Sequence, residues 1–355
     1  MDSTINNYLK GLKVIELASV LAGPTVGMFF AELGAEVIKI ESLIGDVTRG
    51  WKLQEEDANN KESAYFYSAN YNKQYLSLNL NNKVDYKQAI LLIQEADIII
   101  SNFKPSSAKK LRIDYEDLQK INPSVVYAQL VSFDHDIDRP AYDVIIQAES
   151  GFLSMTGLDK EQLCKMPVAL IDLIAAHQMK EAILLALIKR MLSGKGSYIE
   201  VSLLDAGITA LANQASNYLN AGFIAQPMGL LHPNIAPYGE TFVMKDGTQI
   251  VLAVTNDDYF HKLLGVLGLE SDKLYSNNIL RLQNRSKLYD YLESAITRKE
   301  TESLIFLLDE HKIPYGIIKR IDQVMQTAKD RNLVLSEEIN GRATQRIKTV
   351  AFKIK

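Results

Sequence analysis

The sequence predicts an α/β protein in which a large domain with a mostly parallel sheet is joined to a smaller α+β domain. Three observations predict this. Short apolar runs alternate with helix-compatible segments through roughly the first 200 residues, which is typical of a parallel sheet covered by helices. The chain has 355 residues, more than one domain usually holds. Beyond Ala206 the alternation gives way to an irregular stretch with Pro and Gly around Gln226–Gly239.

The elements of the large domain can be assigned in order from their apolar runs. Helices are predicted up to Ala31, over Val84–Glu95 and over Leu173–Leu192, where Gly194 and Gly196 provide a stop signal. The predicted strands are Lys13–Ser19, Glu36–Glu41, Tyr75–Leu80, Asp97–Ser101, Val125–Ser132 and Val168–Ile171. This order is typical of a Rossmann-like domain.

The smaller domain begins with a predicted hairpin at Thr241–Val254, whose turn is Lys245–Gly247, and continues with two or three helices to about His311. We therefore divide the chain as follows: a large domain at 1–205 to which 320–355 returns, a linker at 206–227, a small domain at 228–314 and a second linker at 315–319.

Composition excludes several classes of function. The net charge of −4 is spread over interspersed residues of both signs, so nucleic acid is not an expected partner. Cys164 is the only cysteine, which rules out an internal disulfide and thiolate-rich metal centres. No apolar run reaches the roughly 18–20 residues that span a bilayer, and the N-terminus lacks an export signal. We expect a cytoplasmic protein that does not contact a membrane.

The turn after the first predicted strand could suggest a dinucleotide site. Gly23 and Gly27 lie there, and Glu41 ends the second strand, where an acid that binds ribose would be found. The glycine fingerprint is incomplete, however, and Pro24 removes a backbone N–H that a phosphate would use. We therefore do not expect bound NAD.

Acidic residues also gather at Asp134, His135, Asp136 and Asp138, just before Arg139 and Pro140. Such crowding is more typical of a solvated loop than of a metal site, and the five histidines show no ligand spacing. No metal and no redox cofactor are expected.

Asp172 differs from these groups because it follows an apolar run and opens an amphipathic helix. Its carboxylate would lie near backbone N–H groups and the positive end of the helix dipole, both of which favour the ionised form. The position of Asp172 at the start of a helix is by itself explained by helix capping. A catalytic role depends on the surrounding sequence.

The surrounding sequence resembles the class III CoA-transferases, the family that includes formyl-CoA and carnitine CoA-transferases and α-methylacyl-CoA racemase. The likeness begins with GLKVIELASVLAGPTVGMFFAELGAEVIKIES (Gly11–Ser42) and covers nearly the whole chain. Further matching blocks follow at Gly45–Trp51, Asn72–Leu80, Asn102–Leu118, Arg139–Gly157, Pro167–Leu204 and His232–Tyr238.

The resemblance implies that Asp172 attacks the thioester of an acyl-CoA and passes CoA to a carboxylic acid through an anhydride and an aspartyl-CoA thioester. It places the acyl pocket and oxyanion donors at Tyr142, Asp143 and Gln147. The positions that it implies for CoA binding are Val20, Leu21, Ala22, Lys39, Arg49, Asn72, Lys73, Asn102, Phe103 and Lys110. CoA would enter as part of the substrate, and an interlocked homodimer is implied as well.

Three alternatives remain open beside a transferase: a racemase of the same family, a dinucleotide-binding oxidoreductase and a CoA-binding homologue without catalysis. The chain departs from the family pattern at Lys104–Ser106, where Arg-Pro-Gly is usual, and at Ala141, where Gly is usual. Met228–Leu231 stands where formyl-CoA transferases have a glycine-rich loop. The resemblance therefore implies a class of reaction and leaves the two acids open.

Overall fold

The computed structural model describes residues 7–134, 137 and 139–354, and the chain divides into two compact units. The large unit comprises Met1–Leu153, Lys165–Ala225 and Ala328–Lys355. The small unit comprises Ser154–Cys164 and Gln226–Thr327. We describe each unit by itself.

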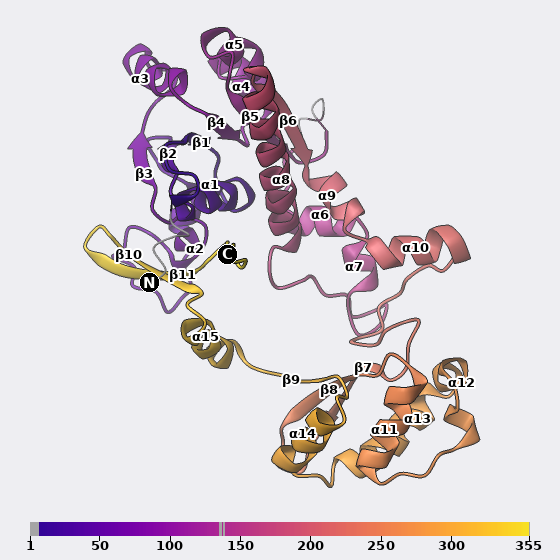
Figure 1. Ribbon diagram of the computed structural model, residues 1–355. Coiled ribbons are helices and arrows are strands. Elements are labelled where there is room, and N and C mark those ends of the chain that lie inside the picture. The colour runs from indigo at the N-terminus through magenta and orange to yellow at the C-terminus, as the bar shows by residue number, and fades with distance from the viewer. Residues whose placement is uncertain (1–6, 135–136, 138, 355) are drawn as a thin grey trace. The chain divides into compact units, whose positions relative to one another are not determined.

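The large unit is built on a parallel sheet of six strands, shown in Figure 1. Its order is β3-β2-β1-β4-β5-β6, and every neighbouring pair is parallel. The strands are β1 (Lys13–Leu17), β2 (Glu36–Glu41), β3 (Gln74–Ser77), β4 (Ile98–Ser101), β5 (Val126–Val131) and β6 (Ser197–Ser202). The strand order reverses between β1 and β4, and in such sheets ligands bind in the crevice outside the carboxyl ends of the strands at this switch point.

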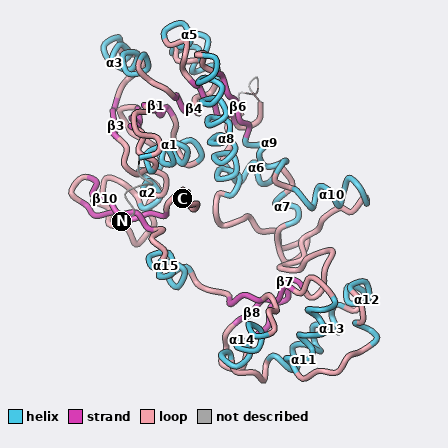
Figure 2. The backbone as a smooth tube through the Cα atoms, in the orientation of Figure 1, coloured by secondary structure: helices cyan, strands magenta, loops and turns pink. Residues whose placement is uncertain are grey.

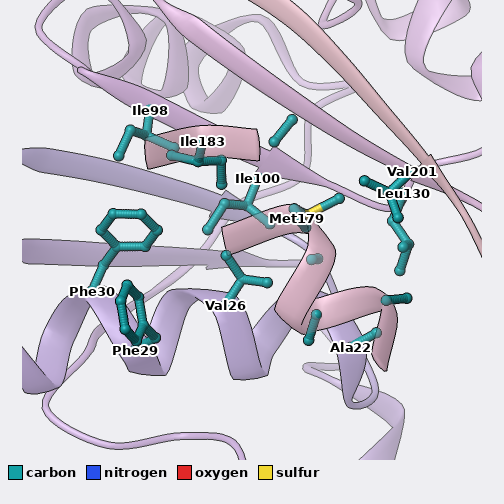
Figure 3. Packing of buried hydrophobic residues seen from close by; sticks show 14 of the residues in the cluster. Ala22, Val26, Phe29, Phe30, Ile98, Ile100, Leu130, Met179, Ile183 and Val201 are labelled. Atoms are coloured by element: carbon teal, nitrogen blue, oxygen red, sulfur yellow. The ribbon is translucent and has the colours of Figure 1, made fainter. Parts of the chain in front are cut away.

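Alternate residues of the strands pack against different helices, as a period of two requires. Val14, Ile98 and Ile100 face the layer formed by α1 (Ala22–Glu32) and α8 (Leu170–Ser193), and Figure 3 shows this packing around Val26 and Met179. The other face packs against α3 (Lys83–Gln94), α4 (Pro105–Leu111) and α5 (Tyr115–Ile121). Both faces are apolar, so the strands read as nearly continuous apolar runs.

Two glycines let α1 lie close against β1. A Cβ at Gly23 would come within 2.5 Å of the Cβ of Ala18, and one at Gly27 would come within 1.9 Å of Glu16 Oε2. The glycines that suggested a dinucleotide turn are therefore explained by close packing of helix, strand and a buried carboxylate.

The remaining elements of the large unit flank this sheet. They are η2 (Val47–Gly50), α2 (Ala64–Tyr67), α6 (Asp143–Glu149), α7 (Phe152–Met155), α9 (Leu203–Thr209), α10 (Ala212–Ala221) and the hairpin of β10 (Val334–Ile339) and β11 (Arg342–Ile347). The backbone N–H of Thr349 donates to Glu32 Oε1 at 2.7 Å, which ties the C-terminal segment to the end of α1. The C-terminal residues thus return to the large unit.

The small unit has its own apolar core around an antiparallel sheet of three strands, whose arrangement can be followed in Figure 2. Its strands are β7 (Tyr238–Val243), β8 (Gln249–Ala253) and β9 (Tyr315–Ile317). Its helices are α11 (Asp257–Leu267), η3 (Lys273–Tyr275), α12 (Asn278–Gln283), α13 (Arg285–Ile296) and α14 (Thr301–Glu310). Strands β7 and β8 form the predicted hairpin, and Gly247 in its turn has a φ of 85°. Helix α15 (Ile321–Asp330) follows β9.

Four differences between the structure and the sequence predictions concern the strands of the large sheet and the two linkers. Val168–Ile171 is not a strand, because α8 already begins at Leu170. Strand β6 was missed because Ser197–Ser202 is an edge strand with alternating burial and lacks an apolar run. The predicted linker 206–227 contains α10, and the predicted linker 315–319 contains β9.

Candidate active site

A crevice opens where the carboxyl ends of β1 and β4 separate. The side chain of Asn102 bridges it, because its Nδ2 donates to the carbonyl oxygen of Ser19 at 2.9 Å and its Oδ1 accepts from the Ser19 N–H at 3.1 Å. The loop then turns at Val20, which has a φ of 74°. The crevice encloses a cavity of about 240 Å³. Its walls include Val20, Leu21, Ala22, Asn102, Phe103, Lys104, Arg139, Tyr142 and Asp172.

Five of the positions expected to bind CoA thus lie together in this cavity. Three come from the turn after β1 and two from the turn after β4, which is the arrangement that the parallel topology dictates. They are Val20, Leu21, Ala22, Asn102 and Phe103.

Asp172 lies in the first turn of α8 and is 7% exposed. The N-cap residue is Ala169, which provides no side-chain hydrogen bond. Instead Asp143 Oδ1 accepts from the N–H of Ile171 at 2.8 Å and from that of Asp172 at 3.4 Å. A carboxylate on another helix therefore caps α8, and capping does not explain Asp172.

The electrostatics of Asp172 are opposite to the sequence expectation, which was an ionised form favoured by the helix terminus. Burial, together with the negative charge of Asp143, raises the pKa of Asp172 to about 7. The N–H groups of the first turn donate to Asp143, so they do not offset the loss of water around Asp172. Asp172 is a buried carboxylate poised between its two protonation states near neutral pH.

The side chain of Gln147 connects Asp143 to the segment before α8 through two hydrogen bonds. Its Nε2 donates to Asp143 Oδ2, and its Oε1 accepts from the N–H of Met166 at 2.9 Å. The side chain is fully buried and connects α6 to the segment before α8. Both ends of the amide are therefore engaged within the protein, whereas Tyr142 is 54% exposed and lines the cavity.

A second cavity of about 710 Å³ is also lined by Asp172. Its walls are mostly apolar and aromatic, with basic residues among them. They include Thr25, Trp51, Tyr65, Tyr142, Asp143, Lys165, Val168, Asp172, Leu173, His177, Lys180 and Lys348. Asp172 is the carboxylate that the two cavities share.

Several residues of this second cavity were not predicted from the sequence. Trp51 is the only tryptophan in the sequence. Its ring centroid lies 5.2 Å from that of Tyr65 and 6.1 Å from that of Tyr142, so the three rings form a partly exposed aromatic cluster. These aromatic residues were the signal that the sequence offered for this cavity. His177 and Lys180 lie on α8 beside other polar residues such as Gln178 and Glu181, and nothing in their spacing indicates a cavity.

Two lysines that the resemblance assigned to CoA lie inside the protein. Lys39 Nζ pairs with Glu16 Oε1 at 2.8 Å and with Asp46 Oδ2 at 3.1 Å. Lys73 Nζ pairs with Glu16 Oε2 at 2.8 Å and donates to the carbonyl oxygen of Pro24 at 2.9 Å. Neither lysine is among the residues that line the two cavities described above. Both stabilise the framework behind the turn at Val20, because the N–H of Val20 donates to Asp46 at 3.2 Å and Asp46 pairs with Lys39.

Burial affects these paired groups differently from Asp172. Burial lowers the pKa of Lys73 to about 8, even though Glu16 opposes the shift. For Lys39 the same effect of burial is outweighed by Glu16 and Asp46, so the pKa of Lys39 is raised. For Asp46 burial is outweighed by Lys39 and the hydrogen bonds from Thr48, so the pKa of Asp46 is lowered.

The other three predicted CoA contacts are also outside the cavities. Arg49 pairs with Glu41 at 3.0 Å and Glu62 at 2.9 Å. Asn72 occupies a turn with a φ of 50°, and its N–H donates to Glu337 at 3.0 Å. Lys110 is exposed in the last turn of α4.

No group of three potential metal-ligating residues is found among the described residues. The acidic stretch considered as a metal site includes His135, Asp136 and Asp138, which lie outside those residues. Within the same described part of the chain, every helix is too short or too polar to cross a bilayer.

The chain is similar to known proteins along nearly its whole length. Residues 9–355 match the profile of CoA-transferase family III. A succinate–glutarate CoA-transferase of Agrobacterium fabrum is 35% identical over 326 residues, which cover 89% of this chain and 81% of the relative. A mouse succinyl-CoA:glutarate CoA-transferase is 32% identical over 94% of this chain and 77% of its own. A solved CAIB/BAIF family protein from Brucella suis matches with a TM-score of 0.85 and 34% identity over 98% of this chain and 93% of the other.

Proposed function

This chain belongs to CoA-transferase family III, and we propose that it moves CoA from an acyl-CoA to a free carboxylic acid through covalent intermediates on Asp172. The observation that carries the proposal is the place of Asp172, the buried carboxylate shared by the two cavities. A nucleophile that handles both a CoA thioester and an acid needs access to both binding spaces.

The reaction proceeds by four exchanges at carbonyl carbons. A carboxylate oxygen of Asp172 attacks the thioester carbonyl, the C–S bond breaks, and CoA leaves as a thiolate from an acyl–aspartyl anhydride. The thiolate then attacks the Asp172 carbonyl and releases the donor acid, which leaves an aspartyl-CoA thioester. The acceptor carboxylate attacks this thioester and expels the thiolate, which attacks the acyl carbonyl of the new anhydride. Acyl-CoA and the Asp172 carboxylate result.

Burial of Asp172 favours these steps. Desolvation makes its ionised form costly, as the raised pKa indicates. Acylation removes the negative charge from the buried side chain, so formation of the anhydride or thioester relieves that cost. A solvated carboxylate would gain nothing comparable from acylation.

The cavity between β1 and β4 is suited to the pantetheine and phosphates of CoA. The turn at Val20–Ala22 offers backbone groups, and Lys104 and Arg139 add positive charge to the wall. Lys110, exposed on α4, stays a proposed phosphate contact. Lys39 and Lys73 act through the framework that holds the turn, whereas Arg49 and Asn72 are held by Glu41, Glu62 and Glu337.

Tyr142 argues for a transferase over a racemase of the same family. A racemase needs two bases to move the α-proton, and a phenol is a poorer general base at neutral pH than an imidazole. We expect no deuterium at the α-carbon when a 2-methylacyl-CoA is incubated with the enzyme in deuterated water. Rapid uptake without an acceptor acid would establish the racemase instead.

We also propose that the chain works as an interlocked homodimer. Helix α8 ends in an exposed apolar row, in which Met191 is 85% exposed and Leu185 and Leu192 are also exposed, and a second copy of the chain would cover it. Sedimentation should find a dimer that persists on dilution to nanomolar protein. A monomer that forms on dilution would contradict the interlocked topology.

The proposed activity is tested with a panel of acyl-CoAs and free acids, and the new thioesters are identified by mass spectrometry. Asp172→Ala and Asp172→Asn should lose at least roughly 1000-fold in turnover and keep the affinity for CoA. Asn caps a helix as well as Asp does, so loss of turnover in Asp172→Asn would show that the carboxylate acts as a nucleophile and not as a helix cap. Retention of more than a few per cent of turnover would rule Asp172 out.

A further inference from the structure

The larger cavity has a basic inner wall that the proposed reaction does not use. His177 and Lys180 of α8 line it together with Lys348, while Trp51 and Tyr65 supply aromatic walls. Apart from Asp172 and Asp143, its lining residues carry no acidic group. The charge of this wall favours an anionic ligand in an otherwise apolar space.

Lys180 is the most deeply buried of these bases, with 4% of its surface exposed. Among the described residues its ammonium makes no hydrogen bond and no ion pair within 4.0 Å, and it lies 5.1 Å from the ring centroid of Phe29. Glu32 attracts it from a distance, but the Glu32 oxygens accept from the N–H groups of Thr349 and Val350. Burial lowers the pKa of Lys180.

Among the described residues no carboxylate lies within ion-pair distance of the Lys180 ammonium, and this distinguishes Lys180 from the other buried lysines. Lys39 and Lys73 each pair with Glu16 at 2.8 Å. Lys180 instead lines a cavity, so a carboxylate of a bound ligand can supply the missing partner.

The position of Lys180 along α8 limits the shape of that ligand. It lies eight residues after Asp172, which corresponds to about 12 Å along the helix axis. All helical side chains lean toward the N-terminus, and lysine is longer than aspartate, so an extended Lys180 side chain would span part of this gap. A short carbon chain with a carboxylate at each end fits between the two residues.

We infer that Lys180 is a specificity-determining residue that binds the distal carboxylate of a short-chain dicarboxylic acid, while the other carboxyl group meets Asp172. The inference rests on the proposed function, since it assigns the acyl group and the acid of that reaction to the dicarboxylic class. His177 and Lys348 add positive charge beside the same carboxylate.

The inference is tested by titration calorimetry with glutarate and with pentanoate, a monocarboxylate of the same chain length. The wild type should bind glutarate about 10- to 100-fold more tightly, the range expected for a charge-assisted hydrogen bond. Lys180→Met should abolish the preference and leave pentanoate binding unchanged. Lys189→Met, an exposed lysine of the same helix, is the matched control and should behave as the wild type.

Equal binding of the two acids by the wild type would overturn the inference even if the variant failed to fold, and so would a preference that survives in Lys180→Met. Turnover with the same acids as acceptors separates the two proposals. Transfer that depends on Asp172 but ignores the distal carboxylate would contradict only the role of Lys180. Glutarate binding that depends on Lys180, without transfer to any acid, would contradict only the transferase reaction.

Discussion

Two buried charge clusters of the large unit differ in how their charges are balanced. Behind the turn at Val20, the lysines at 39 and 73 pair with Glu16 and Asp46 at 3.1 Å or less. At the start of α8, Asp172 lies beside a second acid, Asp143, without a cation in contact among the described residues. One cluster contains balanced charges, and the other contains two acids side by side.

This difference accords with a structural role for the paired charges and with the catalytic role proposed for Asp172. Paired charges satisfy one another and hold the turn that lines the first cavity, since Asp46 accepts from the N–H of Val20. An unpaired buried acid is unstable in its ionised form, and such strain is typical of catalytic groups. The same criterion singles out Lys180 within the second cavity.

Removal of a paired charge should have the largest effect on stability. Lys39→Met leaves the carboxylates of Glu16 and Asp46 buried with less compensation. The variant should lose about 3–5 kcal/mol in free energy of unfolding, measured by urea denaturation at pH 7. A loss below about 1 kcal/mol would show that the ion pairs of Lys39 with Glu16 and Asp46 do not stabilise the fold.

Neutralising Asp172, the unpaired acid, should change the free energy of unfolding in the opposite direction. Asp172→Asn should raise the free energy of unfolding by about 1–3 kcal/mol at pH 8, because the costly buried charge is removed. A raised pKa in the folded state means that stability is present below the ordinary value near 4 and is lost as pH rises to about 7. The advantage of the variant should therefore grow over that window.

Asp46→Asn is the matched control for this measurement. The pKa of Asp46 is lowered in the folded protein, so its contribution is present at neutral pH and is lost in acid. The substitution should destabilise the protein at pH 7. If both variants shifted stability in the same direction, the contrast between the two clusters would fail.

The pH profile of the reaction gives a smaller effect. The ionised form of Asp172 is the nucleophile, so kcat/KM should fall about tenfold for each pH unit below about 7 and level off above it. Thioester formation at a series of pH values, with enzyme stability checked at each, provides the measurement. A profile that is flat down to pH 5 would mean that Asp172 is not desolvated in the working enzyme.

Sequence could predict most strands of the sheet because buried strands leave a local signal, whereas the role assigned to Asp172 rests on the family resemblance and stays a prediction. Strands buried on both faces read as apolar runs, and the turns after β1 and β4 follow from their order. Edge strand β6 alternates in burial, so it left no such run. These differences follow from position in the sheet, which a local pattern does not contain.

The functions of the lysines could not be predicted in the same way. Lys39 and Lys73 occupy family positions, but partners distant in sequence decide that they are buried in ion pairs. Lys180 is followed by Glu181 and resembles a surface lysine in the sequence, and its cavity is formed by segments as distant as Thr25 and Thr349. A lysine becomes a framework or a ligand-binding residue according to contacts that only the folded chain defines.

Detection of a covalent adduct would show directly whether Asp172 becomes acylated. The enzyme is mixed with succinyl-CoA or glutaryl-CoA without an acceptor, trapped with hydroxylamine, digested and examined by mass spectrometry. We expect a hydroxamate on the peptide that contains Asp172 in the wild-type enzyme, and no hydroxamate on this peptide in Asp172→Asn. A hydroxamate on another residue, or turnover by an enzyme in which no carboxylate is converted to a hydroxamate, would contradict the acylation of Asp172.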